Sequence, residues 1–303
     1  KKLAKKLVNI EDARSNHFPI GFKQDDITKP NFTGVKAFNS YCLKEIEAYI
    51  DWTPFFQTWE LAGRYPNILK DEVVGEEATQ LFTDAKKLLH TIVEENWLTA
   101  NGVIGIWPAN TSGDDIEIYT DDSRKEVLNV VHTLRQQTKK AKGAYNMALS
   151  DFIAPKETRI ADYFGGFAVT TGIGIDEHVT RFEADHDDYN SIMLKALADR
   201  LAEAFAELMH EKVRKELWGY ESTEKLSKED LIKESYQGIR PAPGYPACPD
   251  HTEKLTLFKL LDAEKNTKIK LTESLAMVPT AAVSGFYFGH PQSKYFGLGK
   301  IQK

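Results

Sequence analysis

An arginine and a tyrosine in a proline-rich segment have the chemistry needed to hold a charged small molecule. Residues 240–251 read RPAPGYPACPDH, with four prolines and a glycine between positions 241 and 249. Because proline fixes φ, this segment can hold its backbone groups in place at little further entropic cost. The planar guanidinium of Arg240 matches a carboxylate, and Tyr245 offers an aromatic face with a hydroxyl. The residues alone also fit a rigid surface connection whose arginine caps a helix end or pairs with Glu234.

Two acidic residues on a long helical pattern are a second candidate. Asp199 and Glu203 are four residues apart and therefore share one face of a helix, where like charges are mildly destabilising. Such a pair suits a cationic partner. The alternative is a solvated surface on which Lys195 and Arg200 neutralise both carboxylates.

Three other motifs give weaker evidence for a functional site. The pair Cys248-x-x-His251 has the spacing of zinc ligands, but a zinc site needs at least one more protein ligand and no second pair accompanies it. Residues 172–174 read GIG, which lacks the third glycine of a phosphate-binding loop and precedes two acidic residues. Residues 186–188 read HDD, which favours a helix start. No Ser/His/Asp or Cys/His set is recognisable, so we predict binding residues, no catalytic group and no metal site.

Composition restricts the class of protein. Apolar residues make up 42% of the chain and charged residues 28%, an ordinary globular balance. The net charge of −6 argues against a nucleic-acid binder, and no run of eighteen apolar residues predicts a membrane span. The two cysteines argue against a disulfide framework and favour a reducing compartment, which predicts a cytoplasmic protein.

Hydrophobic patterning predicts a mixed domain. We expect long helices at 77–96, 124–140 and 189–218 and short helices around 45–49 and 255–263. Pro54 is expected to end the helical run that includes residues 45–49. The expected strands are 102–107, 115–119, 164–171 and 284–288. Strands and helices do not alternate strictly. The predicted fold is therefore α+β: one large domain over residues 9–303 with a central, mainly antiparallel sheet and flanking helices, and not a Rossmann fold. Residues 1–8 are predicted to be an interdomain linker.

A family resemblance covers nearly the whole chain from about Asn9 onward. Residues 240–255, RPAPGYPACPDHTEKL, resemble the signature of the activation domain of cobalamin-dependent methionine synthases, whose Arg-x-x-x-Gly-Tyr motif contacts S-adenosylmethionine. Further segments resemble that family in the same order: DWTPFF (51–56), DEVVG (71–75), DDIE (114–117), LRQQ (134–137), DFIAP (151–155), KALADRLAEAFAE (195–207), LTES (271–274) and SKY (293–295).

The resemblance implies a set of ligand contacts. It implies that S-adenosylmethionine is bound by Asp51, Arg240 and Tyr295, with Glu203, Glu234, Ala242, Tyr245 and Phe296 around them. In this interpretation Asp51 accepts from the ligand ammonium and Arg240 clamps its carboxylate. Tyr245 and Tyr295 supply aromatic walls for the adenine or the sulfonium methyl. Phe296 stands where some members carry tyrosine, so a hydroxyl-dependent hydrogen bond is not expected there.

The resemblance also implies a function. The domain would bind S-adenosylmethionine and present its methyl group for reductive remethylation of inactive cob(II)alamin held on a neighbouring domain, with an electron from flavodoxin or a flavoprotein reductase. Catalysis would be mainly orientation, so the isolated chain would bind the ligand without turnover. Family members continue past the equivalent of Lys303 with a helical segment. The alternative is a docking or capping module that recruits the reductase without binding S-adenosylmethionine. A conventional Rossmann methyltransferase is disfavoured because a glycine-rich loop after a first strand is missing.

Overall fold

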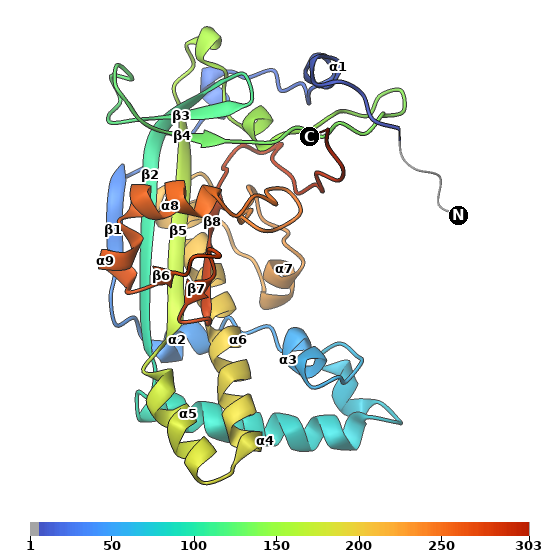
Figure 1. The fold of residues 1–303 in the computed structure, drawn as a ribbon, viewed down its shortest axis with the longest axis vertical. Coiled ribbons are helices and arrows are strands. Elements are labelled where there is room, and N and C mark those ends of the chain that lie inside the picture. The colour runs from blue at the N-terminus through green and yellow to red at the C-terminus, as the bar shows by residue number, and fades with distance from the viewer. Residues whose placement is uncertain (1–5, 303) are drawn as a thin grey trace.

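The computed structural model describes residues 6–302 of the 303-residue chain (Figure 1). Its α-helices are α1 (Ile10–Ser15), α2 (Leu43–Glu47), α3 (Thr53–Thr58), α4 (Gly75–Glu94), α5 (Ile175–Ala184), α6 (Asp188–Lys212), α7 (Lys228–Ile232), α8 (Glu253–Leu261) and α9 (Ala263–Thr267). A π-helical turn, η5 (Val213–Leu217), continues α6, and short 3₁₀ helices are η1 (Gln24–Asp26), η2 (Asn67–Lys70), η3 (Leu149–Phe152) and η4 (Lys156–Thr158). The strands are β1 (Gly34–Phe38), β2 (Thr99–Ser112), β3 (Asp115–Tyr119), β4 (Val127–His132), β5 (Asp162–Ile173), β6 (Lys270–Leu271), β7 (Met277–Val278) and β8 (Ala282–Tyr287).

Two long neighbouring strands organise the described part of the chain. Six strands form one sheet in the order β4-β3-β2-β5-β8, and β1 pairs with the first half of β2. Every pairing in this sheet is antiparallel. A separate two-stranded ribbon joins β6 to β7. The predicted mixed domain with a central antiparallel sheet is therefore confirmed.

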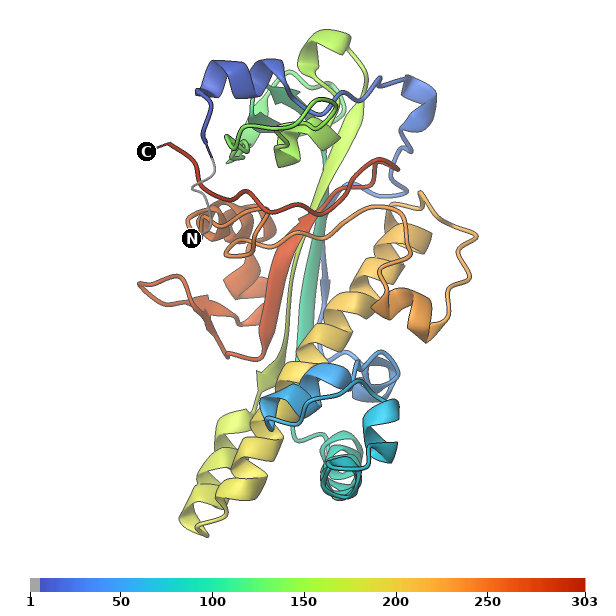
Figure 2. The ribbon, with the colours of Figure 1, turned by 90° about the vertical axis from the view of Figure 1, so that its right-hand side faces the viewer.

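Helices cover both faces of the sheet, which Figure 2 shows nearly edge-on, with α6 on one side and α8 and α9 on the other. Side chains alternate accordingly along the strands. On β5, Phe167 and Val169 face the core under α6, whereas Phe164 and Ala168 face the core under α8. This burial of both faces explains why β2 and β5 read as nearly continuous apolar segments.

Most predicted elements are confirmed. The helix expected at 77–96 is α4, and the one expected at 189–218 is α6 with its π turn. The strand expected at 115–119 is β3, with the same bounds. A helix start at 186–188 is confirmed, because the side chain of Asp187 accepts from the backbone N–H of Asn190 and caps α6.

Two predicted features are wrong. Residues 124–140 are not helical: the segment 127–132 is strand β4, in which Val131 pairs with Ile116 of β3. The hairpin pairing overrides the weak helical spacing of its apolar residues. Pro54 begins helix α3 instead of ending a run, because the first turn of a helix has no use for the N–H that proline lacks.

The predicted linker lies partly outside the described residues. Residues 1–5 are not described. Of the rest, Val8 donates its backbone N–H to the carbonyl of Gln137 at 2.8 Å, and Leu7 bridges to Thr138. Among residues 6–302, no helix has both the length and the apolar character needed to cross a membrane.

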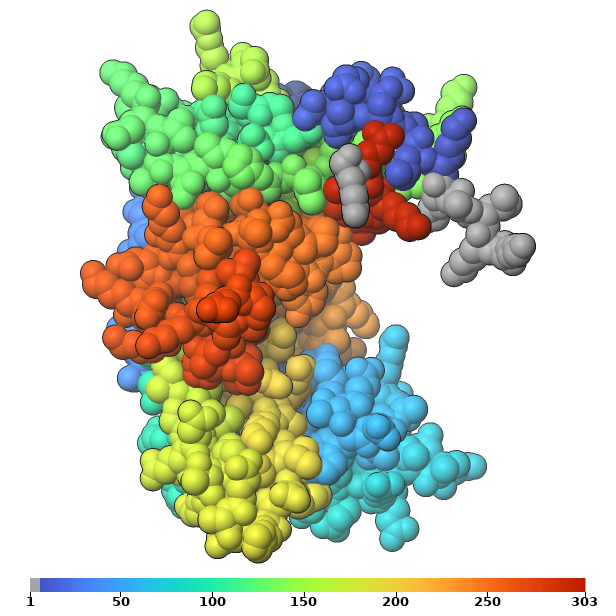
Figure 3. Space-filling view, viewed as in Figure 1, coloured from blue at the N-terminus to red at the C-terminus, as the bar shows by residue number. Residues whose placement is uncertain are grey.

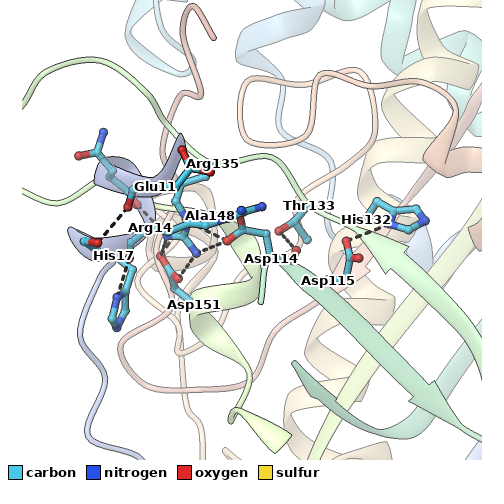
Figure 4. A network of polar contacts seen from close by, with 12 residues as sticks. Glu11, Arg14, His17, Asp114, Asp115, His132, Thr133, Arg135, Ala148 and Asp151 are labelled. Atoms are coloured by element: carbon cyan, nitrogen blue, oxygen red, sulfur yellow. Dashed lines mark hydrogen bonds and ion pairs between the residues drawn. The ribbon is translucent and has the colours of Figure 1, made fainter. Parts of the chain in front are cut away.

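A buried arginine joins the β3–β4 hairpin to the η3 segment (Figure 4). Arg135 makes paired hydrogen bonds to Asp151 at 2.7 and 2.8 Å and contacts Asp114 at 2.6 Å. Burial alone lowers the pKa of Arg135, but the two carboxylates outweigh it and the pKa is raised. Arg14 of α1 binds the other oxygen of Asp114 at 2.9 Å from a half-exposed position. Three segments that carry the family resemblance are thus held together by one structural ion network.

Two arginines that contact the same carboxylate should differ in their contribution to stability. We expect Arg135→Met to lower the free energy of unfolding by about 3 kcal/mol or more, because it leaves buried Asp151 uncompensated. Arg14→Met should change it by about 1 kcal/mol at most, because that side chain is exposed. Urea unfolding measures both. Equal effects of the two substitutions would contradict the structural role of Arg135.

Candidate functional site

Two adjoining cavities contain all eight predicted binding residues. The first, named the Asp51 cavity, has a volume of about 580 Å³, and the second, named the Tyr245 cavity, has about 470 Å³. Asp51 lines the first, and Ala242, Tyr245, Tyr295 and Phe296 line the second. Glu203, Glu234 and Arg240 line both and therefore mark the junction. In the space-filling view the light-blue segment around α3 lies below the orange segments that follow α6, and the outline is indented above it (Figure 3).

One face of α6 supplies the acidic wall. Glu203, Glu207 and Glu211 recur every four residues and all line the Asp51 cavity. Alanine residues of the same turns, such as Ala202 and Ala206, are buried in the core beside this face. The helix therefore buries its small side chains and presents its carboxylates to the cavity.

The proline-rich segment is fixed on strand β8. Ile239 bridges to Phe288, and the carbonyl of Pro241 accepts the backbone N–H of Phe286 at 2.8 Å. Gly285 makes this approach feasible, because a Cβ there would lie 2.7 Å from the Pro241 carbonyl oxygen. Arg240 is thus held by the backbone on both sides, as the stiffness of the sequence predicted.

Arg240 is paired with Glu207 and not with Glu234. Its Nη2 donates to Oε2 of Glu207 at 2.6 Å, and its Nη1 donates to the hydroxyl of Tyr236 at 2.8 Å and to Nδ1 of His210 at 3.0 Å. Burial alone lowers the pKa of Arg240, but the negative charge of Glu207 outweighs it and the pKa is raised. The guanidinium is therefore a permanent cation held in a fixed plane.

His210 is neutral in this arrangement. It is fully buried on α6, and burial together with the charges of Arg240 and Arg214 lowers its pKa well below the usual value. Because Nδ1 accepts from Arg240, the ring proton resides on Nε2. The ring stacks on Tyr287 of β8 at 5.2 Å and meets Tyr236 edge-on at 4.8 Å.

The aromatic side chains of the Tyr245 cavity differ in how firmly they are held. The hydroxyl of Tyr295 accepts the backbone N–H of Arg240 at 3.0 Å. Phe296 packs edge-on against Phe152 at 6.3 Å and belongs to the core under α8. Tyr245 is 61% exposed at the cavity rim, although partial burial still raises the pKa of its hydroxyl. One tyrosine is therefore anchored and the other is free to cover a ligand.

The Asp51 cavity has an excess of negative charge. Its carboxylates are Asp51, Glu203, Glu207, Glu211 and Glu234, and its cations are Arg200, Lys228 and Arg240, so five negative groups face three positive ones. Asp51 accepts the backbone N–H of Thr53 at 3.0 Å, which orients it at the start of α3. This lining suits a ligand that carries positive charge.

Several other sequence candidates lie outside the cavities. Asp199 is exposed and lines neither of them. Cys248 is buried, and among the residues that the structure describes no group of three or more His, Cys, Asp or Glu side chains is arranged to hold a metal ion. Patterning missed Glu207, His210 and Tyr236. The four-residue spacing after Glu203 was the available signal for Glu207.

Two comparisons with known proteins give matches over most of the chain. Residues 42–303, which include all eight cavity residues, match the family described as vitamin B12 dependent methionine synthase, activation domain. The chain is also similar to a solved crystal structure of the MetH reactivation domain bound to AdoHcy, with 56% sequence identity and a TM-score of 0.94. That similarity covers 97% of this chain and 90% of the other.

The buried neutral histidine predicts a stability that depends on pH. Below pH 6.5 the unfolded chain protonates His210 and the folded chain does not, so wild type should lose stability relative to His210→Gln as pH falls. The difference should change by about 1.4 kcal/mol per pH unit at most. Burial also raises the pKa of Asp162 to about 6, which stabilises the folded chain as pH falls. This effect is the same in both proteins and cancels in their difference. Urea unfolding from pH 7.5 to pH 5.5 measures this difference. If the free energies of unfolding of wild type and His210→Gln ran parallel against pH, the folded chain would protonate His210 as readily as the unfolded chain.

Proposed function

This chain belongs to the family of activation domains of vitamin B12-dependent methionine synthases, and we propose that its two adjoining cavities bind S-adenosylmethionine. The observation that carries the proposal is the convergence of Asp51, Arg240 and Tyr295 from segments far apart in the sequence. Each cavity is within the range of roughly 300–1,000 Å³ that is usual for ligand sites. The related structure holds AdoHcy, which is S-adenosylmethionine without its transferable methyl group.

The charges of the ligand match the lining residue by residue. The ligand carries a sulfonium, an ammonium and a carboxylate. We assign the ammonium to Asp51 with Glu203 and Glu234 nearby, and the carboxylate to Arg240 at the junction. The aromatic faces of Tyr245 and Tyr295 suit the adenine or the sulfonium methyl, since a cation is attracted to the face of an aromatic ring. Ala242 and Phe296 complete the wall of the Tyr245 cavity.

The residues of this chain act by orientation. The proline-stiffened segment and α6 hold the ligand so that its methyl group faces a neighbouring domain of the same polypeptide. Cobalamin on that domain would supply the methyl acceptor, and flavodoxin or a flavoprotein reductase would supply the electron that reactivation needs. Because orientation alone requires no side chain to act as base or nucleophile, the isolated chain should bind S-adenosylmethionine without turnover. The cytoplasm remains our prediction for its location.

A docking module without a ligand is the less favoured function. In that function the two cavities would bind no ligand, and the similar structure that holds AdoHcy gives no support to that view. The lining of the Asp51 cavity, with five carboxylates against three cations, also suits a cationic ligand better than an empty surface connection.

Calorimetric titration with S-adenosylmethionine tests the proposed site. Wild type should release or absorb heat on binding, and Asp51→Asn should raise Kd roughly 10- to 100-fold, the usual effect of losing a hydrogen bond to a charged group. Asp199→Asn is the matched control: it removes the same charge from an exposed position on α6 and should leave Kd unchanged. No heat and no thermal shift with wild type would favour the docking function, and an unchanged Kd in Asp51→Asn would remove Asp51 from the site.

A further inference from the structure

We propose that Glu207 is a two-position carboxylate that leaves Arg240 for Arg214 when the carboxylate of a ligand binds Arg240. The inference rests on the proposed function, because it concerns how the site accepts an amino-acid ligand. It assigns Glu207 and Arg214 as positioning residues, which act through Arg240 and do not touch the reacting atoms.

Glu207 lies between two arginines. Its Oε2 accepts from Nη2 of Arg240 at 2.6 Å, and its Oε1 lies 3.9 Å from Nη1 of Arg214. Glu207 and Arg214 are seven residues apart along α6 and η5, two turns of the same continuous helix, so both project from one face. A shift of about 1 Å would bring the second pair within hydrogen-bond distance.

The second position is prepared but unused. Arg214 is fully buried, and its Nε and Nη2 donate to Glu224 at 2.7 and 2.8 Å. Within residues 6–302, Nη1 of Arg214 and Oε1 of Glu207 are both buried and have no hydrogen-bond partner. Buried atoms of opposite charge that face each other without a hydrogen bond are rare in folded proteins, because each loses its hydrogen bonds to water without a replacement. Their pairing is therefore favourable as soon as Arg240 has another anion.

Arg240 keeps its place when Glu207 moves. Its Nη1 remains bound to Tyr236 and His210, which are independent of Glu207. Tyr236 also lies against Arg214, whose guanidinium carbon is 4.1 Å from the ring centroid, so one ring supports both arginines. The guanidinium of Arg240 thus stays oriented while one of its donors is released to the ligand.

Charge explains why the two carboxylates exchange instead of sharing. A ligand carboxylate beside Glu207 on one guanidinium would place like charges a few ångströms apart in a partly buried site, where they repel strongly. Moving Glu207 to Arg214 separates the two anions and keeps each arginine paired. A ligand that lacks the carboxylate brings no second anion to Arg240, so Glu207 stays paired with it. The site should therefore couple Arg214 to the ligand carboxylate although the two do not touch.

A double-mutant cycle with two ligands tests this coupling. The proteins are wild type, Arg214→Lys, Glu207→Gln and the double variant, and the ligands are S-adenosylmethionine and its decarboxylated analogue, titrated by calorimetry. Lysine at 214 can keep the pair with Glu224 but has no planar fork to reach Glu207 as well. We expect Arg214→Lys to raise the Kd for S-adenosylmethionine about tenfold and to leave the Kd for the decarboxylated ligand unchanged. In the Glu207→Gln background the same substitution should have no effect on either ligand.

The outcomes separate this inference from the proposed function. If wild type binds neither ligand, the proposed function fails. If wild type binds both, and Arg214→Lys weakens both equally or keeps its effect beside Glu207→Gln, only the exchange is refuted. Should the variants not fold, a crystal structure of the wild-type chain with S-adenosylmethionine decides: Glu207 hydrogen-bonded to Arg214 supports the exchange, and Glu207 still on Arg240 overturns it.

Discussion

The ion pair between Arg240 and Glu207 links the two halves of the site. Arg240 comes from the proline-rich segment pinned to the edge strand β8, and Glu207 comes from the helix that covers the other side of the cavities. A buried guanidinium must be compensated by a nearby anion. Together with the hydrogen bond from Arg240 to His210 of the same helix, the pair sets the distance between the loop and the helix, and with it the junction at which the Asp51 and Tyr245 cavities meet.

The sheet provides the rigid frame on which this pair depends. The long strands β2 and β5 are covered on both faces, so their positions are over-determined by packing. Strand β8 extends this frame to the edge, and Gly285 lets the backbone of Pro241 approach it closely. The junction of the two cavities, lined by Glu203, Glu234 and Arg240, then lies at the border between the sheet edge and α6. A site placed in this way on rigid elements loses little conformational freedom on binding.

The sequence predicted the long elements better than the local details. Helices α4 and α6 are long enough for their apolar residues to recur at helical spacing over several turns, and polar and apolar residues alternate along β3. Strand β4 was missed because pairing with β3, a contact invisible in a local window, determines its conformation. Residue type and spacing singled out Arg240, Tyr245 and Glu203, whereas the other five cavity residues came from the family resemblance alone. His210 and Tyr236 could not be foreseen, since their role depends on how α6, β8 and the segment after α7 meet in space.

The burial of charge in this molecule explains why an arginine can line an acidic cavity. Arg240 and Arg214 are balanced by Glu207 and Glu224, so this group of four is neutral as a whole, and within it Arg214 is fully buried. His210 adds no charge, because burial and the neighbouring arginines keep it deprotonated. The field in the Asp51 cavity then arises from the remaining lining, in which Asp51, Glu203, Glu211 and Glu234 outnumber Arg200 and Lys228. The same cavity can thus attract a cationic ligand and still offer a fixed guanidinium to the carboxylate at one end of it.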